Sequence, residues 1–246
     1  MHRFFIPADR ISENKVVITG KPVHQIRNVL RLGASDRITV LDNSGWQYEI
    51  EIQKVDSTRV EGSVVARSPA GAEPRTKITL YQALLKGSNF EFVLQKCTEI
   101  GVASFVPLIC ERCVASAPDS KRLSRWRNII TEAAEQSRRG RLPVLQSPTS
   151  FTDACKSASR ISLLTWEGEK LRSIGDVLRS HQKIRNDSVI SIFVGPEGGF
   201  STHEVEFARS CGIVPVSLGH RILRAETAGL VAVTITLYEF GDLNNG

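Results

Sequence analysis

The hydrophobic pattern of this chain changes once, at a segment rich in Pro, Gly, Ala and Ser, "RSPAGAEPRT" (residues 67–76). Before this segment, short β-branched or alternating runs are separated by Gly, Asp and Asn, which is typical of a β-rich unit. After it, strand-like runs alternate with helical stretches, which favours a mostly parallel sheet covered by helices on both faces. The change predicts an α/β protein of two domains, residues 1–72 and 73–246.

The N-terminal domain is predicted to be barrel-like with one helix. Four runs predict its strands: "NKVVITG", "DRITVLD", "GWQYEIEIQKV" and "RVEGSVVA". Between the first two, "KPVHQIRNVLRLG" predicts a helix whose apolar face carries Val23, Ile26, Val29 and Leu30. A small β-barrel interrupted by one helix fits this order.

In the C-terminal domain, two Ser/Glu pairs at capping-box spacing predict helix starts, and three glycines predict helix ends. These residues are Ser88 with Glu91, Ser201 with Glu204, and Gly101, Gly140 and Gly212. The final run, "TAGLVAVTITLYEF", is apolar nearly all round. Its β-branched residues favour a strand and its length favours a buried helix, so periodicity leaves both open.

The formal charge of +6 at pH 7 suits a polyanionic partner, although many basic proteins never bind nucleic acid. No apolar run approaches the roughly 20 residues of a membrane span, and the N-terminus, broken at Pro7 and Asp9, does not resemble a signal peptide. A cytoplasmic location is therefore expected. Cys110 and Cys113 form a C-x-x-C without a second ligand pair, so we expect two structural thiols and no metal site.

Three loops follow strand-like runs, and parallel sheets bind ligands beyond the carboxyl ends of their strands. They are "TWEGE", "GPEGGFS" and "LGHRILRAETA". The glycines of the middle loop let the backbone approach a ligand, but the loop lacks both phosphate-binding and dinucleotide motifs. Its Glu197 would repel a phosphate and tolerate a cation such as the sulfonium of S-adenosylmethionine. A plain strand-to-helix turn is the alternative for this loop taken alone.

The third loop carries Arg221, Arg224 and Glu226 directly before the apolar run. Such a cluster is unusual for a simple surface turn, although an Arg–Glu salt bridge is an alternative explanation.

The run "FVGPEGGFSTHEVE" followed by "SLGHRILRAETAGL" resembles the signature of the 16S ribosomal-RNA uridine-N3 methyltransferases, the ribosomal RNA small subunit methyltransferase E family. The resemblance extends through "HRFF", "HQIRNVLRLGASDRITVLDNSG", "LLKGSNFEFVLQKCTEIGV", "PLICERC", "EAAEQSRRGRLP" and "FGDL". It implies a SPOUT methyltransferase with a PUA-like RNA-binding β-barrel (1–72) and an α/β domain with a trefoil knot (73–246). It also implies a homodimer that acts on 16S rRNA of the small ribosomal subunit.

The resemblance places S-adenosylmethionine on the three loops. The implied cofactor-binding residues are Thr165, Trp166 and Glu167, then Gly195, Pro196, Glu197, Gly198 and Gly199, then Leu218, Gly219, Ile222, Leu223 and Arg224. Uracil N3 must lose a proton before it attacks a methyl group. We therefore expect Arg224 to stabilise negative charge on the carbonyl oxygens, and Glu226 to accept the proton or orient Arg224.

RNA contacts are expected on basic residues of both domains, because phosphate contacts dominate such binding. The candidates are Lys121 and Arg125 on one helix face, Arg138, Arg139 and Arg141 at the exit of that helix, and Arg3, Arg27 and Arg31 near the N-terminus. A solvated basic face is the alternative for each.

Three rival functions remain open from the sequence. A related knotted methyltransferase could act on a ribose 2′-hydroxyl or on transfer RNA. The same domains could form a non-catalytic RNA-binding assembly factor. A nucleotide-dependent enzyme is the third, disfavoured by Glu197 and by the missing phosphate motifs.

Overall fold

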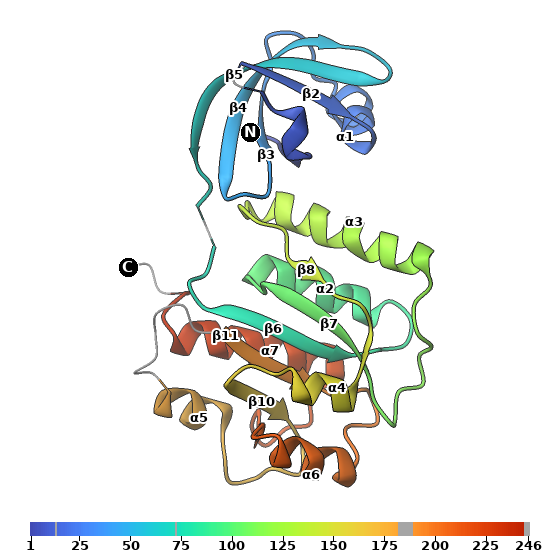
Figure 1. The fold of residues 1–246 in the computed structure, drawn as a ribbon, viewed down its shortest axis with the longest axis vertical. Coiled ribbons are helices and arrows are strands. Elements are labelled where there is room, and N and C mark those ends of the chain that lie inside the picture. The colour runs from blue at the N-terminus through green and yellow to red at the C-terminus, as the bar shows by residue number, and fades with distance from the viewer. Residues whose placement is uncertain (13, 72, 182–188, 244–246) are drawn as a thin grey trace. The chain divides into compact units, whose positions relative to one another are not determined.

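The computed structural model describes residues 1–12, 14–71, 73–181 and 189–243. The chain divides into two compact units: Met1–Glu73 with Ala134–Leu142, and Pro74–Ala133 with Pro143–Gly246 (Figure 1). The first unit therefore takes in a short segment, 134–142, that the change of sequence pattern assigned to the second domain. Glu73 explains this grouping, because its carboxylate accepts hydrogen bonds from the backbone N–H groups of Gly140 and Arg141.

The N-terminal unit is built on a five-stranded sheet in the order β1-β3-β4-β5-β2. Its strands are β1 (Arg3–Phe5), β2 (Lys15–Thr19), β3 (Arg37–Leu41), β4 (Trp46–Val55) and β5 (Arg59–Pro69). Its short helices are η1 (Ala8–Arg10), α1 (Lys21–His24) and η2 (Gln25–Val29). The four predicted strands are confirmed. β1 is a fifth strand, and its three residues are too few to show an alternating pattern of apolar and polar side chains. β1 pairs with β3 in parallel, whereas the other pairs are antiparallel.

The predicted N-terminal helix is wider than expected. Its second half makes a π turn, in which the Leu30 N–H donates to the carbonyl of Gln25, five residues back, at 2.9 Å. Val23 and Ile26 are buried as predicted, but Val29 is 63% exposed. The prediction that Val29 lies on the apolar face is therefore wrong, because the wide turn rotates it away from the core.

The C-terminal unit is built on a parallel sheet in the order β12-β10-β11-β6-β7-β8, with β9 also paired to β7 (Figure 1). Its strands are β6 (Lys77–Ala83), β7 (Ser104–Ile109), β8 (Val144–Leu145), β9 (Thr149–Ser150), β10 (Ile161–Thr165), β11 (Val189–Val194) and β12 (Val214–Val216). Its helices are α2 (Asn89–Ile100), α3 (Ser120–Gln136), α4 (Phe151–Lys156), α5 (Ile174–Ser180), α6 (Thr202–Ser210) and α7 (Ala225–Glu239). The last three residues of α3, 134–136, belong to the first unit.

Two hydrophobic clusters cover the two faces of this sheet. One joins the sheet to α2, α3, α5 and α7, and the other joins it to α4 and α6. Alternate residues of a strand enter different clusters: Ile192 lies in the first and Phe193 in the second. The prediction of a parallel sheet covered on both faces is confirmed.

The last apolar run is helical, which settles the question that periodicity left open. α7 packs against α2, α5, β6 and β11. A Cβ on Gly229 would lie 2.8 Å from Oε1 of the buried Gln82, so glycine permits this close approach of helix and strand. Although α7 is strongly apolar, no helix in the described part of the chain is long and apolar enough to cross a membrane.

The capping box at the start of α6 is confirmed, because Ser201 and Glu204 exchange both reciprocal hydrogen bonds. Ser88 does precede α2 as predicted, but it makes no side-chain cap. Its ψ of 0° differs from the extended backbone of a capping residue, and Glu91 pairs instead with Arg125 at 2.7 Å.

The glycine signals mark two of three helix ends. Gly101 and Gly212 follow α2 and α6 with positive φ angles, as expected. Gly140, however, does not end α3. The helix ends at Gln136 in a Schellman motif: the Arg139 N–H donates to the carbonyl of Ala134, and Arg138 adopts a φ of 61°. Arginine thus occupies the left-handed position that glycine normally takes.

Replacing Arg138 with glycine should raise the midpoint of thermal unfolding, because a non-glycine residue in the left-handed region costs about 1 kcal/mol. For a chain of this length, such a gain corresponds to about 2–4 °C, measurable by calorimetry. Arg138→Ala is the matched control, since it removes the same side chain and keeps the steric cost. Equal increases in both variants would show that backbone strain is not the cause.

Candidate cofactor and RNA site

Three loops meet at one edge of the parallel sheet, because β10 lies between β11 and β12. Leu164 of β10 is in register with Phe193 of β11, and Thr165 is in register with Val216 of β12. All three strands run in the same direction, so the segments that follow them leave the sheet at its carboxyl edge. The structure thus brings together the three segments that the sequence analysis singled out.

The loop after β10 is anchored to both neighbours. Thr165 Oγ1 donates to the carbonyl of Phe193 at 3.2 Å, and the Trp166 N–H donates to the carbonyl of Val216 at 3.0 Å. The Trp166 ring is confined, because a Cβ on Gly168 would overlap it. Glu167 is exposed beyond this anchored pair.

The loop after β11 is a tight turn. The Gly199 N–H donates to the carbonyl of Pro196 at 2.9 Å, and Gly199 has a φ of 66°. Gly195 and Pro196 are buried, whereas Glu197 and Gly198 are exposed. One carboxylate oxygen of Glu197 accepts the Lys86 N–H at 3.0 Å. Glu197 therefore ties this loop to the segment after β6, a role that the sequence analysis did not foresee.

The loop after β12 is joined to the loop after β10 by backbone hydrogen bonds. The Ser217 N–H donates to the carbonyl of Arg172 at 2.8 Å, and the carbonyl of Ser217 accepts the Ile174 N–H at 3.1 Å. Gly219 follows with a φ of 109°. Leu218 and Leu223 pack against the core, whereas Ile222 is 83% exposed.

Arg224 and Glu226 lie at the start of α7. Arg224 is the residue directly before the helix and is exposed, and Glu226 lies half-buried in the first turn. In the described residues, neither these side chains nor Arg221 form an ion pair. The salt bridge considered as an alternative is therefore absent from this part of the chain, and the charged groups are available to a ligand.

A fourth segment, after β7, reaches the same edge and was missed by sequence reasoning. Arg112 Nη1 donates to the carbonyl of Gly198 at 2.9 Å, and the arginine Cβ lies 3.4 Å from the position of a Cβ on Gly198. The run "PLICERC" contributed to the family resemblance, but nothing in its spacing indicated a contact with a loop 86 residues away.

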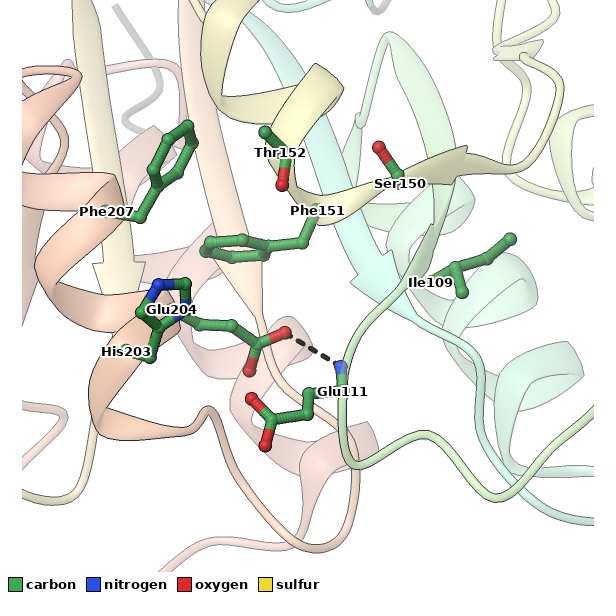
Figure 2. A pocket seen from close by; sticks show the side chains of 8 residues that line it. All are labelled: Ile109, Glu111, Ser150, Phe151, Thr152, His203, Glu204 and Phe207. Atoms are coloured by element: carbon green, nitrogen blue, oxygen red, sulfur yellow. Dashed lines mark hydrogen bonds between the residues drawn. The ribbon is translucent and has the colours of Figure 1, made fainter.

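A pocket of about 240 Å³ opens beside this segment (Figure 2). It is lined by Ile109, Glu111, Ser150, Phe151, Thr152, His203, Glu204 and Phe207. Figure 2 shows the Phe151 ring in the middle and Glu204 reaching the Glu111 N–H, which donates to it at 2.9 Å. Phe151 also lies 5.3 Å from the ring of Phe200, so the pocket adjoins the end of the loop after β11.

Within the C-terminal unit, the predicted RNA-binding residues lie on the surface. Lys121 is exposed on α3, and Arg125 is 68% exposed despite its ion pair with Glu91. Both side chains can reach a phosphate.

Within the N-terminal unit, the predicted basic residues divide. Arg27, Arg31, Arg138 and Arg141 are exposed. Arg139 is only 3% exposed and pairs with Glu73 at 2.7 Å, so its prediction as an RNA contact is corrected: it is a structural residue. Arg3 is half-buried and donates to Gln47 Oε1 at 2.8 Å. Burial and the nearby charge of Arg138 lower the pKa of Arg3.

The metal prediction concerned the cysteines. Cys110 and Cys113 are free thiols, and no group of three or more His, Cys, Asp or Glu residues in the described ranges could hold a metal ion.

Comparison with known proteins identifies the family to which the chain belongs. Residues 72–237 match the model of the RNA methyltransferase domain. Ribosomal RNA small subunit methyltransferase E of Synechocystis is 34% identical over 94% of this chain and 76% of its own length, and that of Bacillus subtilis is 32% identical over 97% of each.

Solved structures agree. The methyltransferase E of Neisseria gonorrhoeae, bound to S-adenosylmethionine, is 32% identical with a TM-score of 0.85 over 95% of both chains. A Legionella pneumophila putative methyltransferase, in complex with the same cofactor, is 27% identical with a TM-score of 0.82 over 96% of both. The chain therefore belongs to the ribosomal RNA small subunit methyltransferase E family.

Proposed function

We propose that this protein transfers the methyl group of S-adenosylmethionine to N3 of one uridine in 16S rRNA of the small ribosomal subunit. Membership of the family supports the coarser statement, a cofactor-dependent methyltransferase of small-subunit ribosomal RNA. The observation that carries the proposal is the meeting of three anchored loops at one sheet edge, with Arg224 and Glu226 on the third.

The residues at this edge fit S-adenosylmethionine. The position of a Cβ on Gly199 lies 3.9 Å from Glu167 Oε1, so the first two loops approach each other at this point, and the φ of 66° is the reason that glycine is favoured there. A phosphate site would favour a lysine or arginine in the loop, and residues 195–199 contain neither. The carboxylates of Glu167 and Glu197 suit a cation instead. The proposed cofactor contacts are the thirteen positions named from the sequence, from Thr165 to Arg224. When bound, the cofactor supplies an electrophilic methyl group on a positively charged sulfur.

The chain's own residues must make uracil N3 nucleophilic. Ionising N3 at pH 7 costs about 3–4 kcal/mol, at 1.36 kcal/mol per pH unit. A cation beside the carbonyl oxygens offsets this cost, because the negative charge gathers there. Arg224 is exposed and forms no ion pair with any residue that the structure describes, so we assign it this role. Glu226, two residues further on in the first turn of α7, accepts the N3 proton or orients Arg224.

The finer fold is part of the same proposal. β11 lies between β10 and β6 although it follows both in the chain, and α7 returns to pack on β6 and β11. This order supports a knotted SPOUT domain, and the five-stranded N-terminal unit supports a PUA-like barrel. Phe92 on α2 and Tyr238 on α7 are exposed on neighbouring helices, which supports a homodimer. A ribosomal substrate supports a cytoplasmic location.

The rival functions differ in their product. A ribose or transfer-RNA methyltransferase would use the same three loops, whereas an assembly factor would have no need of the exposed Arg224 beside them. Incubation with labelled S-adenosylmethionine and small subunits from a strain lacking this gene, followed by mass spectrometry of nucleosides, distinguishes them. N3-methyluridine in 16S rRNA supports the proposal. A methylated ribose, or label on transfer RNA alone, contradicts it.

Arg224→Ala should reduce methyl transfer by about 10²–10³-fold while S-adenosylmethionine still binds, because one donor to a developing negative charge is lost. The readouts are the single-turnover rate and the cofactor affinity by calorimetry. Arg224→Lys, which keeps the charge without the planar fork, should recover part of the rate. A near-normal rate in Arg224→Ala would exclude this residue from the chemistry.

Affinity for small-subunit RNA should fall steeply with salt, and Lys121→Ala should reduce the slope of log affinity against log salt by about 0.7–0.9, the value for one phosphate contact. Arg179→Ala is the matched control, since Arg179 is exposed but already paired with Asp176 and Glu239. Filter binding between about 50 and 200 mM salt measures both. A slope unchanged in Lys121→Ala would show that this face does not touch RNA.

A further inference from the structure

Cys110 and Cys113 close a turn directly after β7. The Cys113 N–H donates to the carbonyl of Cys110 at 3.1 Å, and the Cys110 N–H donates to Cys113 Sγ at 3.3 Å. The second sulfur is therefore folded back over the backbone of the first cysteine. These thiols have no part in the proposed reaction.

The geometry of this turn suits a disulfide bond. A four-residue turn brings its first and last Cα atoms within about 7 Å, and disulfides span Cα distances of about 4.4–6.8 Å. The two thiols can thus be joined by side-chain rotation and a small adjustment of the turn.

The two sulfurs differ in exposure and acidity. Cys113 is half-buried, and its hydrogen bond with Cys110 lowers its pKa to about 7. Cys110 is 6% exposed; the hydrogen bond with Cys113 and burial raise the pKa of its thiol. An accessible, acidic thiol beside a second, buried thiol is the arrangement found in oxidation-sensitive pairs.

The other thiols lack this arrangement. Burial raises the pKa of Cys97, which lies inside α2, and raises the pKa of Cys155 to about 12. Cys211 is exposed at the end of α6, and its nearby charge adds to burial in raising the pKa of Cys155. No cysteine lies within the turn of Cys211 itself, so Cys211→Ser is the control that separates oxidation at this second place from oxidation of Cys110 and Cys113.

The two residues between Cys110 and Cys113 contact the loop after β11 and the helix that follows it. Arg112 donates to the carbonyl of Gly198. The Glu111 N–H donates to Glu204 of α6, a contact that Figure 2 shows. Closing a disulfide across these two residues changes the backbone that carries both contacts.

We propose that Cys110 and Cys113 are an oxidation site: a hydroperoxide converts them to a disulfide, which loosens the contact between Arg112 and Gly198 and weakens S-adenosylmethionine binding. The formation of the disulfide is independent of the proposed function, whereas its effect on cofactor affinity rests on that function.

The chemistry balances with hydrogen peroxide as the oxidant. The Cys113 thiolate attacks one peroxide oxygen, the O–O bond breaks, and a sulfenic acid forms as hydroxide leaves and takes up a proton. The Cys110 sulfur then attacks the Cys113 sulfur, the S–O bond breaks, and the hydroxyl group leaves as water with the Cys110 proton. Two thiols and one peroxide give one disulfide and two waters.

Peptide mapping tests the disulfide on the full-length protein. Trypsin cleaves after Arg112, so peptides 97–112 and 113–121 separate in the reduced protein and stay joined if the disulfide has formed. We expect the joined species after mild hydrogen peroxide treatment, and its loss with dithiothreitol. Cys110→Ser and Cys113→Ser should each abolish it, whereas Cys211→Ser should not. A bond to Cys155, or sulfonic acid without any disulfide, would overturn the proposal.

Calorimetry tests the coupling. Oxidation should weaken S-adenosylmethionine binding by about tenfold, the order expected for losing one hydrogen bond from a charged donor, and dithiothreitol should restore it. Cys110→Ser and Cys113→Ser, with circular dichroism to verify folding, should bind like the reduced protein and resist peroxide. A disulfide that leaves the affinity unchanged would overturn the coupling. Reduced protein that binds no cofactor would contradict the proposed function, and peptide mapping would still decide the oxidation site.

Discussion

The parallel pairing of β10 with both β11 and β12 is the constraint on which the rest of the C-terminal unit depends. It places three loops at one edge and lets backbone hydrogen bonds such as Ser217 to Arg172 hold them together. Arg224 and Glu226 then reach that edge because α7 begins where the third loop ends. A register shift at β10 would separate these segments, because the strand pairing sets where each loop begins and the side-chain contacts of Thr165, Glu197 and Arg112 depend on that placement.

Local patterns predicted most elements of this fold. Four strands of the first unit, the alternating strands and helices of the second, and the capping box of α6 follow from rules that act within a few residues. Sequence reasoning was wrong where a tertiary contact or a different backbone angle intervened. The π turn leaves Val29 exposed. Glu91 pairs with Arg125 and therefore does not cap α2, and Arg138 adopts the left-handed conformation that was expected of Gly140 at the end of α3.

The candidate site was partly predictable for the same reason. Glycines and charged residues after strands indicated the three loops, but the internal partners of those residues are far away in sequence. Glu197 contacts Lys86, Arg112 contacts Gly198, and Arg139 is buried against Glu73. A basic residue in a sequence looks the same whether it faces a phosphate or a carboxylate, so only the fold separates Arg139 from its exposed neighbours.

The position of β11 has a consequence for how the chain reaches this structure during synthesis. Val189 pairs with Lys77 on one side and Ile190 with Ile161 on the other, yet both partners leave the ribosome first. The edges of β6 and β10 therefore stay unpaired until β11 is synthesised, and β11 then inserts between these two strands. Such non-local pairing is slow and leaves strand edges open to other chains, so the last third of the sequence governs when the nascent protein becomes safe from aggregation.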